Sequence, residues 1–297
     1  MTERIQKSHV KAAEDRRDSR EFRRKWQKFM RNKAAVFGSV LIFLYLLTAL
    51  FASVLFPGNP SAPNLIRSLE RPSWQHPLGT DELGRSILGR IIHGARVSLL
   101  IAVGVVAVGL LVGVPLGLIS GYYGGKVDFF IQRVTDTLLA FPGFLLALSL
   151  VAVLGVGLKN TVISVGISMV PLYTRLVRGC ALQIREQVYV EAARAIGTRN
   201  RTILWRHVLP NVTIPITVQT SLGMGTAILF AAGLGFLGIG VQPPTPEWGT
   251  MLGSGRAYLF HAPHVATFPG IAIFLAVLGF NLAGDGLRDI LDPRFRL

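Results

Sequence analysis

The chain has 297 residues, of which 51% are hydrophobic and only 16% are charged. Soluble domains carry about 25% charged residues, so this composition excludes an ordinary soluble fold, and the hydrophobicity excludes a disordered chain. The single cysteine, Cys180, excludes a scaffold of intrachain disulfides, and the net charge of +15 indicates either a membrane surface or nucleic acid as a partner.

The first segment, residues 1–33, is strongly basic, with 12 lysine or arginine residues and five acidic ones. Four large apolar residues in it are spaced to line one face of a helix: Phe22, Trp26, Phe29 and Met30. We therefore expect a cytoplasmic, basic, amphipathic arm that lies on anionic lipid and leads into the first span. On this interpretation the positive charge faces the lipid bilayer, and nucleic acid is not a partner.

Long uncharged segments follow the arm. A helix needs about 20 apolar residues to cross the hydrocarbon core of a bilayer. Five segments without acidic or basic residues reach this length, and a sixth does so if two arginines near its end extend to the headgroups. The six are residues 34–56, 97–123, 137–158, 160–180, 208–246 and 257–284. The pattern predicts an all-α, polytopic membrane protein with six transmembrane helices.

These spans divide the chain into a simple order. We expect the arm, a first transmembrane helix over 34–56, an external loop over 57–96, a transmembrane domain of five helices over 97–290 with a cytoplasmic loop over 181–211, and a cytoplasmic tail over 291–297. With six spans, 24 of the 31 lysine and arginine residues fall on the side of the N-terminus and six on the other. Because basic loops stay on the cytoplasmic side, both termini are expected to be cytoplasmic in a multi-pass protein of the cell membrane.

Glycines recur every four residues along the second expected span. They are Gly109, Gly113, Gly117 and Gly121. On a helix this spacing forms one ridge, along which the backbone of a neighbouring helix can approach closely. We therefore predict a helix-packing face here.

The sequence gives little support to catalysis. It contains no G-x-x-x-x-G-K-[ST] phosphate loop, and the G-x-G-x-x-G string at residues 233–238 lies in an uncharged run instead of following a strand. We expect no catalytic residue and no bound cofactor in this chain. Asp136 and Asp285 lie at the edges of expected spans, which weakens an ion-coupled carrier or channel and leaves it as the alternative hypothesis, ahead of a membrane-embedded enzyme.

Histidines raise the question of a metal site. His261 and His264 form an H-x-x-H pair, and His76 and His93 lie in the first external loop. Pro263 interrupts the pair and argues against a regular helix that carries both ligands, so we expect no metal.

The cytoplasmic loop over 181–211 is the most informative segment. It contains E-A-A-R-A-I-G at residues 191–197, which is rich in helix formers and stops at a glycine suited to a helix C-terminus. An apolar stripe at helical spacing is formed by Val188, Ala192, Ala195 and Ile196. Such a short helix cannot bury this stripe alone, so it needs either the membrane surface or another protein to lie against.

The residues of this loop resemble the E-A-A-x-x-x-G motif that identifies permease subunits of ABC importers. Glu191, Ala192, Ala193 and Gly197 match it, as do Leu209 and Pro210 at its end, although His207 stands where the general pattern has isoleucine. Further strings resemble the dipeptide/oligopeptide/nickel group, and its C-type subunit in particular: they are 76–81 (H-P-L-G-T-D), 121–125 (G-Y-Y-G-G), 206–211 (R-H-V-L-P-N), 247–252 (E-W-G-T-M-L) and 284–289 (G-D-G-L-R-D).

This resemblance implies a type I ABC importer-like permease that couples to separate subunits. The helix at 191–197 would be the coupling helix that docks on an ATPase subunit. Glu191 would orient the loop through hydrogen bonds or an ion pair, Ala192 and Ala193 would permit close approach, and Gly197 would make the turn. ATP and Mg would be bound by two partner ATPase subunits, so this chain would hold no cofactor and would not be an enzyme.

The resemblance also implies partners along the transport path. A second permease subunit, expected to be a related chain in a heterodimer, would complete the pore, with the glycine ridge or the fifth span as its contact. An extracytoplasmic solute-binding protein would deliver cargo to the loops over 57–96 and 241–264. Di- or oligopeptides are the implied cargo, with nickel and glutathione as alternatives that the sequence does not separate.

Overall fold

The computed structural model describes residues 27–291, and within them the chain is helical and contains no strand. Most of the expected arm, including Phe22 and Trp26, and nearly all of the expected tail lie outside the described residues. The α-helices are α2 (Lys33–Leu50), α3 (Ala52–Leu55), α4 (Ile87–Tyr123), α5 (Gly125–Leu139), α6 (Gly143–Leu154), α7 (Leu158–Arg185), α8 (Val188–Ala195), α9 (Asn200–Ile203), α10 (Leu209–Phe236), α11 (Trp248–Gly255) and α12 (His264–Leu291).

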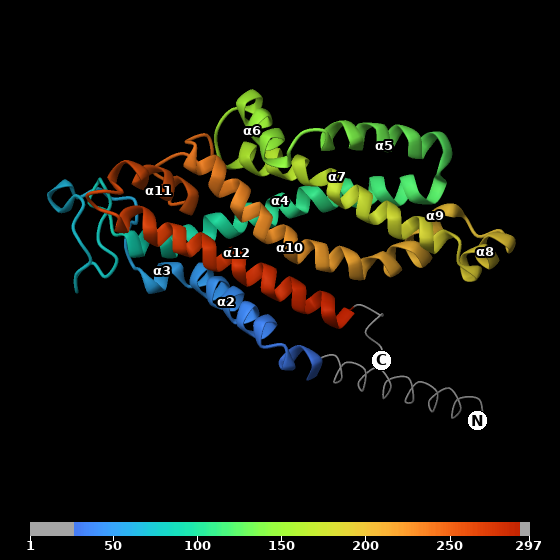
Figure 1. Ribbon diagram of the computed structural model, residues 1–297, viewed down its shortest axis with the longest axis horizontal. Helices are drawn as coiled ribbons and strands as arrows, with labels where there is room; N and C mark the ends of the chain where they lie inside the picture. The colour runs from blue at the N-terminus through green and yellow to red at the C-terminus, as the bar shows by residue number, and fades with distance from the viewer. Residues whose placement is uncertain (1–26, 292–297) are drawn as a thin grey trace.

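The long helices α4, α7, α10 and α12 lie along the long axis of the molecule (Figure 1). Helices α8 and α9 lie at one end, which we call the α8 end. Helix α11 and the loop between α3 and α4 lie at the opposite end, the α11 end. The ribbon also shows that α2 begins, and α12 stops, on the side of the α8 end (Figure 1).

Four described helices are long and apolar enough to cross a membrane, namely α2, α4, α10 with its preceding turns, and α12. The bent pair α5 and α6 makes a fifth if it is one broken span. Helix α7, with 28 residues, is also long enough to cross a membrane, but it carries four basic residues: Lys159, Arg175, Arg178 and Arg185. The chain is therefore a multi-pass, all-helical membrane protein.

The expected continuous span over 137–158 is wrong, because the chain bends by 89° between α5 and α6. The residue before a proline is disfavoured in the helical conformation, which favours a break between Phe141 and Pro142, although α4, α7, α10 and α12 each accommodate an internal proline. Pro142 itself has extended backbone angles and stands at the start of α6.

Other helix boundaries also differ from the expected spans. Helix α4 begins at Ile87, ten residues before the expected position, and Ser86 caps it by accepting a hydrogen bond from the Gly89 amide. The first ten residues of α4 are too polar for hydropathy to identify them as part of a span. The expected spans over 208–246 and 257–284 are also displaced, since α10 stops at Phe236 and α12 starts at His264. Helix α11 lies in the connection between them.

The glycine ridge of α4 packs against α7 of the same chain. A β-carbon at Gly113 would lie 2.8 Å from the carbonyl oxygen of Val170, and one at Gly117 would lie 2.6 Å from that of Thr174. At Gly109 and Gly121 the nearest atoms also belong to α7. The ridge is therefore already covered, which corrects the expectation that it could offer a face to a second permease subunit.

Candidate functional site

The loop between α7 and α10 is seated on the bundle by its own small core. Val190 and Ala193 of α8 are buried, together with Ile203, in one apolar cluster with the last turns of α4 and α7. The other buried members of this cluster are Leu118, Tyr122, Val177, Ala181, Val208 and Val212. Helix α8 is thus held at the α8 end by side chains of three longer helices, α4, α7 and α10.

Gly197 ends α8 in a conformation that favours glycine. Its φ is +78°, and its amide donates to the carbonyl of Arg194 while the amide of Thr198 donates to the carbonyl of Ala193. These two bonds make a Schellman motif, which satisfies carbonyl groups that the helix end would otherwise leave unpaired. The motif reverses the chain toward α9.

The opposite face of α8 is exposed. Val188 and Ile196 are 79% and 82% exposed, and Ala192 and Ala195 on the same stripe are exposed as well. Trp205, in the π-helical turn that precedes α10, is 67% exposed. The loop therefore presents an apolar surface, which we call the α8 stripe, on a firmly anchored base.

The structure separates the two alanines that the sequence motif groups together. Ala193 is 7% exposed and points into the seat of α8, whereas Ala192 is exposed on the α8 stripe. Glu191 is exposed, and among the described residues its side chain makes no hydrogen bond or ion pair. Glu191 lies in the first turn of α8, where the positive end of the helix dipole stabilises a negative charge.

Tyr122, at the end of α4, joins the loop to the bundle. Its hydroxyl donates to the Asn200 Oδ1 atom at 2.9 Å and accepts from the Arg194 Nε atom at 3.4 Å. The Arg194 guanidinium also lies 5.0 Å from the centre of the Tyr122 ring, a cation–π contact. One side chain of α4 thus contacts both α8 and α9.

The exit from the loop is a continuous helical turn. Leu209 begins α10 directly after the π-helical turn, and Pro210 occupies its first turn, where a missing amide proton costs little. The side-chain Nδ2 atom of Asn211 donates to the His207 carbonyl and to the Tyr189 hydroxyl, which ties this turn back to α8.

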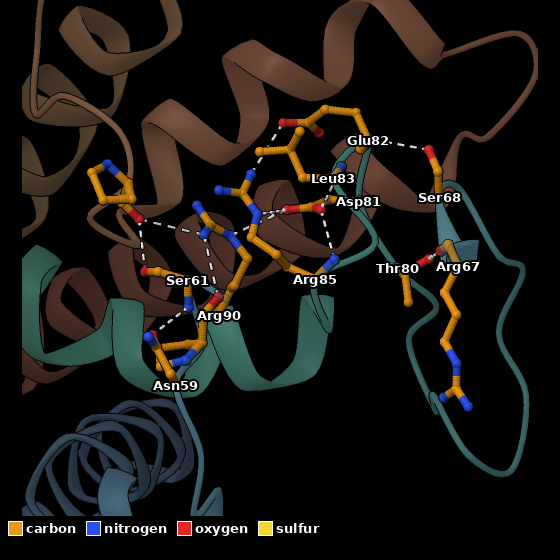
Figure 2. A network of polar contacts seen from close by, with 12 residues as sticks. Asn59, Ser61, Arg67, Ser68, Thr80, Asp81, Glu82, Leu83, Arg85 and Arg90 are labelled. Atoms are coloured by element: carbon orange, nitrogen blue, oxygen red, sulfur yellow. Dashed lines mark hydrogen bonds and ion pairs between the residues drawn. The ribbon is translucent and has the colours of Figure 1, made fainter. Parts of the chain in front are cut away.

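At the α11 end a buried network of charges orders the loop between α3 and α4 (Figure 2). The Asp81 carboxylate accepts from the Arg85 Nε atom at 2.7 Å and pairs with the Arg90 Nε atom at 3.4 Å. Arg90 also donates to the carbonyls of Pro60 and Pro244, which come from two distant loops. The network therefore fastens the α3–α4 loop and the α10–α11 loop to the first turns of α4.

Glu247 fixes α11 against the bundle in a second buried contact. Its carboxylate, 2% exposed, accepts from the amides of Gly249 and Thr250 at 2.9 and 2.8 Å and from the Ser98 hydroxyl of α4 at 3.3 Å. Burial raises the pKa of the Glu247 carboxyl, and the hydrogen bonds that it accepts act in the opposite direction. The next residue, Trp248, is fully buried and donates to the Ile91 carbonyl.

The four histidines of the α11 end lie in different surroundings. The His76 ring contacts the Arg67 guanidinium, the His93 ring contacts the Phe56 carbonyl, and His264 begins α12 beside Gly79. His261 is exposed in the turn before α12. Among residues 27–291 no three histidine, cysteine or acidic side chains lie together as metal ligands would.

Comparison with known proteins assigns this architecture to a family. The model of the binding-protein-dependent transport system inner membrane component matches residues 113–297, and that of the N-terminal TM domain of oligopeptide transport permease C matches residues 21–72. The chain is 46% identical to the dipeptide transport system permease protein DppC of Alkalihalophilus pseudofirmus, over 93% of this chain and 90% of that protein. It is also 46% identical to the glutathione transport system permease proteins GsiD of Pectobacterium atrosepticum and Escherichia coli, over 91% of this chain and 90% of each.

The chain belongs to the binding-protein-dependent transport system inner membrane component family. The permease also shares its fold with an inward-facing structure of the MetNI methionine ABC transporter, with a TM-score of 0.56 and 19% identity over 68% of this chain and 96% of that one. The sequence-based assignment to ABC importer permeases is confirmed, and the ion-coupled alternative is not favoured.

Within the permease, the sequence indicated the loop between α7 and α10 but not the contacts of Tyr122 that attach this loop to α4. Tyr122, Arg194 and Asn200 lie far apart in the sequence or outside the motif, and their contact depends on how α4 ends beside the loop. The aromatic pair in the string at 121–125 was the available signal, because a tyrosine at a helix end provides both a ring and a hydroxyl for polar partners.

Proposed function

We propose that this permease forms half of the translocation path of an ATP-driven importer whose cargo is a short peptide. The relatives that support this cargo are named for dipeptide and for glutathione transport. Both solutes are short peptides with ionised ends, so a translocation path with the same chemical properties can carry either of them. Nickel, the other cargo of the wider group, has no support from these relatives.

The α8 stripe is the observation that carries the proposed coupling. Val188, Ala192 and Ile196 are exposed on a short helix whose other face is buried and whose end is fixed by Gly197. Apolar side chains held in this way fit a groove on a partner protein. In this proposal the partners are two ATPase subunits, which bind ATP and Mg and move the loop when they close.

The topology that fits this function has six passes, with α2, α4, the α5–α6 pair, α7, α10 and α12 crossing in turn. Both described chain ends lie on the side of the α8 end (Figure 1), so both termini and the α8 loop would face the cytoplasm. A solute-binding protein would then meet the α11 end from outside, and a second, related permease subunit would complete the pore.

Glutamate substitutions at two adjacent alanines, Ala192 and Ala193, test the proposed docking. Ala192→Glu places a carboxylate in the α8 stripe without touching the seat, so we expect co-purification of the ATPase subunits to fall at least about tenfold, or about 1.4 kcal/mol of binding. Ala193→Glu buries the charge in the seat and is expected to lower the unfolding temperature of the permease itself.

Leu65→Glu is the matched control, because Leu65 is an exposed apolar residue at the α11 end, 68% exposed. It should leave ATPase co-purification unchanged. Normal co-purification and ATP-driven uptake in Ala192→Glu would overturn the docking role of α8.

A further inference from the structure

Two ion pairs join α5 to α7, and they differ in exposure. The Arg178 guanidinium binds the Asp128 carboxylate through both Nε and Nη2, each at 2.6 Å, and these side chains are 32% and 18% exposed. One turn earlier the Arg175 Nη2 atom lies 2.6 Å from the Asp136 Oδ1 atom, and these side chains are 56% and 51% exposed. The second pair therefore lies on the outer surface of the chain.

This exposed pair lies far from both ends of α7. The 28 residues of α7 make a helix about 42 Å long, and Arg175 lies about 5 Å from its middle. A bilayer core is about 30 Å thick, so with the middle of α7 at the midplane Arg175 lies about 10 Å inside the edge of the core. In this placement Arg175 does not reach the headgroups, although the sequence alone led us to expect that it would. Exposed ionised groups at such depth do not face lipid, since intramembrane charges face a bundle interior or a water-filled cavity.

The opposite side of the molecule shows what a lipid-facing surface looks like in this chain. Beyond Lys33, helix α2 has no charged residue, and its exposed side chains include Phe37, Phe43 and Leu44, each more than 50% exposed. Helix α2 packs on α12, whereas α5 lies over α7 on the other side of the ribbon (Figure 1). The α5 side also exposes apolar side chains, such as Phe129 and Phe130 at 57% and 68%, but of these two sides it is the one that carries an exposed ion pair.

Arg175 is part of a longer exposed line on α7. Leu172, 45% exposed, lies one turn before it, and Gly179 lies one turn after it, where a β-carbon would meet open space. These three positions share one face of the helix, away from the side that packs on α4.

We propose that the face of α7 formed by Leu172, Arg175 and Gly179 lines the water-filled path, and that Arg175 and Asp136 form a contact point for the ionised ends of the cargo. This inference rests on the proposed importer function. A guanidinium binds a carboxylate through two parallel hydrogen bonds, and a carboxylate binds an ammonium group, so the pair is complementary to a zwitterionic peptide. In the absence of cargo the two side chains satisfy each other, so the path is not left with an unpaired charge.

Cysteine accessibility tests this assignment in the full transporter complex. Cys180 is the only cysteine of this chain, so Cys180→Ser removes its native thiol, and labelling is read on this chain after the subunits are separated. In it, Leu172→Cys and Gly179→Cys should react with a charged methanethiosulfonate reagent at least about tenfold faster than Phe43→Cys on α2 or buried Val165→Cys on α7, because only a hydrated thiol ionises to the reactive thiolate. A saturating dipeptide should slow the reaction at Leu172→Cys.

A second variant isolates the role of the charges. Neutralising both partners, with Arg175→Gln and Asp136→Asn, should remove the protection by dipeptide while leaving the thiol reactive. Reactivity at Leu172→Cys and Gly179→Cys no higher than at Phe43→Cys would overturn the path assignment, and protection that survives neutralisation would overturn the contact point. Failure of the proposed function would look different, because the Cys180→Ser parent would then show no ATP-driven dipeptide uptake.

Discussion

Position 197 requires glycine because of its backbone conformation and not because of crowding by neighbouring atoms. A β-carbon placed on it would meet no neighbouring atom within 4 Å, so space does not demand glycine there. The φ of +78° does, because an L-residue in this region brings its β-carbon close to the following carbonyl oxygen. The conformational and steric contributions can therefore be separated at this residue.

We predict that Gly197→Asn retains ATP-driven uptake, whereas Gly197→Val loses most of it. Asparagine visits the left-handed region at modest cost, but a β-branched residue there costs at least about 1–2 kcal/mol and opens the Schellman motif. Initial uptake rates, with amide hydrogen exchange of α8 as the structural readout, check this. Equal rates in both variants would show that the turn does not depend on this backbone angle.

Arg90 makes a second residue-scale prediction, at the α11 end. Arg90→Ala removes a buried cation from Asp81 and from two loop carbonyls, so it should lower the free energy of unfolding by about 3 kcal/mol. Arg71→Ala, at an exposed position in the same loop, should change it by less than about 0.5 kcal/mol. Thermal unfolding of the purified permease compares the two, and equal losses would contradict a special role for the network.

At the scale of elements, the packing of α4 on α7 depends on glycines, three of which lie against backbone carbonyl oxygens of α7. A side chain can turn away from an added methyl group, but a carbonyl oxygen in a helix cannot. The close approach of these two helices is therefore set by residue size along the ridge.

We predict that Gly113→Ala destabilises the permease by about 1–3 kcal/mol, because its methyl group would overpack the contact with Val170 and Tyr173. Gly270→Ala in α12 is the matched control, since the nearest atom to its β-carbon is the end of the flexible Leu252 side chain, at 3.7 Å. Its higher helix propensity should make it neutral or stabilising by up to about 1 kcal/mol. Unfolding temperatures that fall equally in both would argue against the ridge.

The sequence predicts some of these elements well and others poorly. Hydropathy located α2 and the apolar part of α4, because a span is a local property of the chain. It missed the first turns of α4, where Arg90 is accommodated only through partners at Asp81, Pro60 and Pro244. Periodicity indicated the stripe that α8 leaves exposed, but it could not show that Ala193 points inward, since that depends on how α4 and α7 end beneath it.

At the scale of the whole molecule, the alternating direction of the long helices leads to a topology prediction. In the Cys180→Ser background, Ser73→Cys at the α11 end should react with a membrane-impermeant maleimide on intact cells. Arg201→Cys at the α8 end should react only after the membrane is permeabilised. Labelling of both positions, or the reverse order, would contradict six passes with cytoplasmic termini.

Helix α4 connects the two ends of the permease. Its 37 residues extend about 55 Å, with Arg90 held in the charged network near its first residue and Tyr122 holding the α8 loop near its last. Because both attachments are made by one helix, we expect a displacement of the α8 loop to move α4 and, with it, the loops at the α11 end. In the proposed topology, α4 would then transmit the nucleotide state of the ATPase subunits to the loops on the outer side of the membrane.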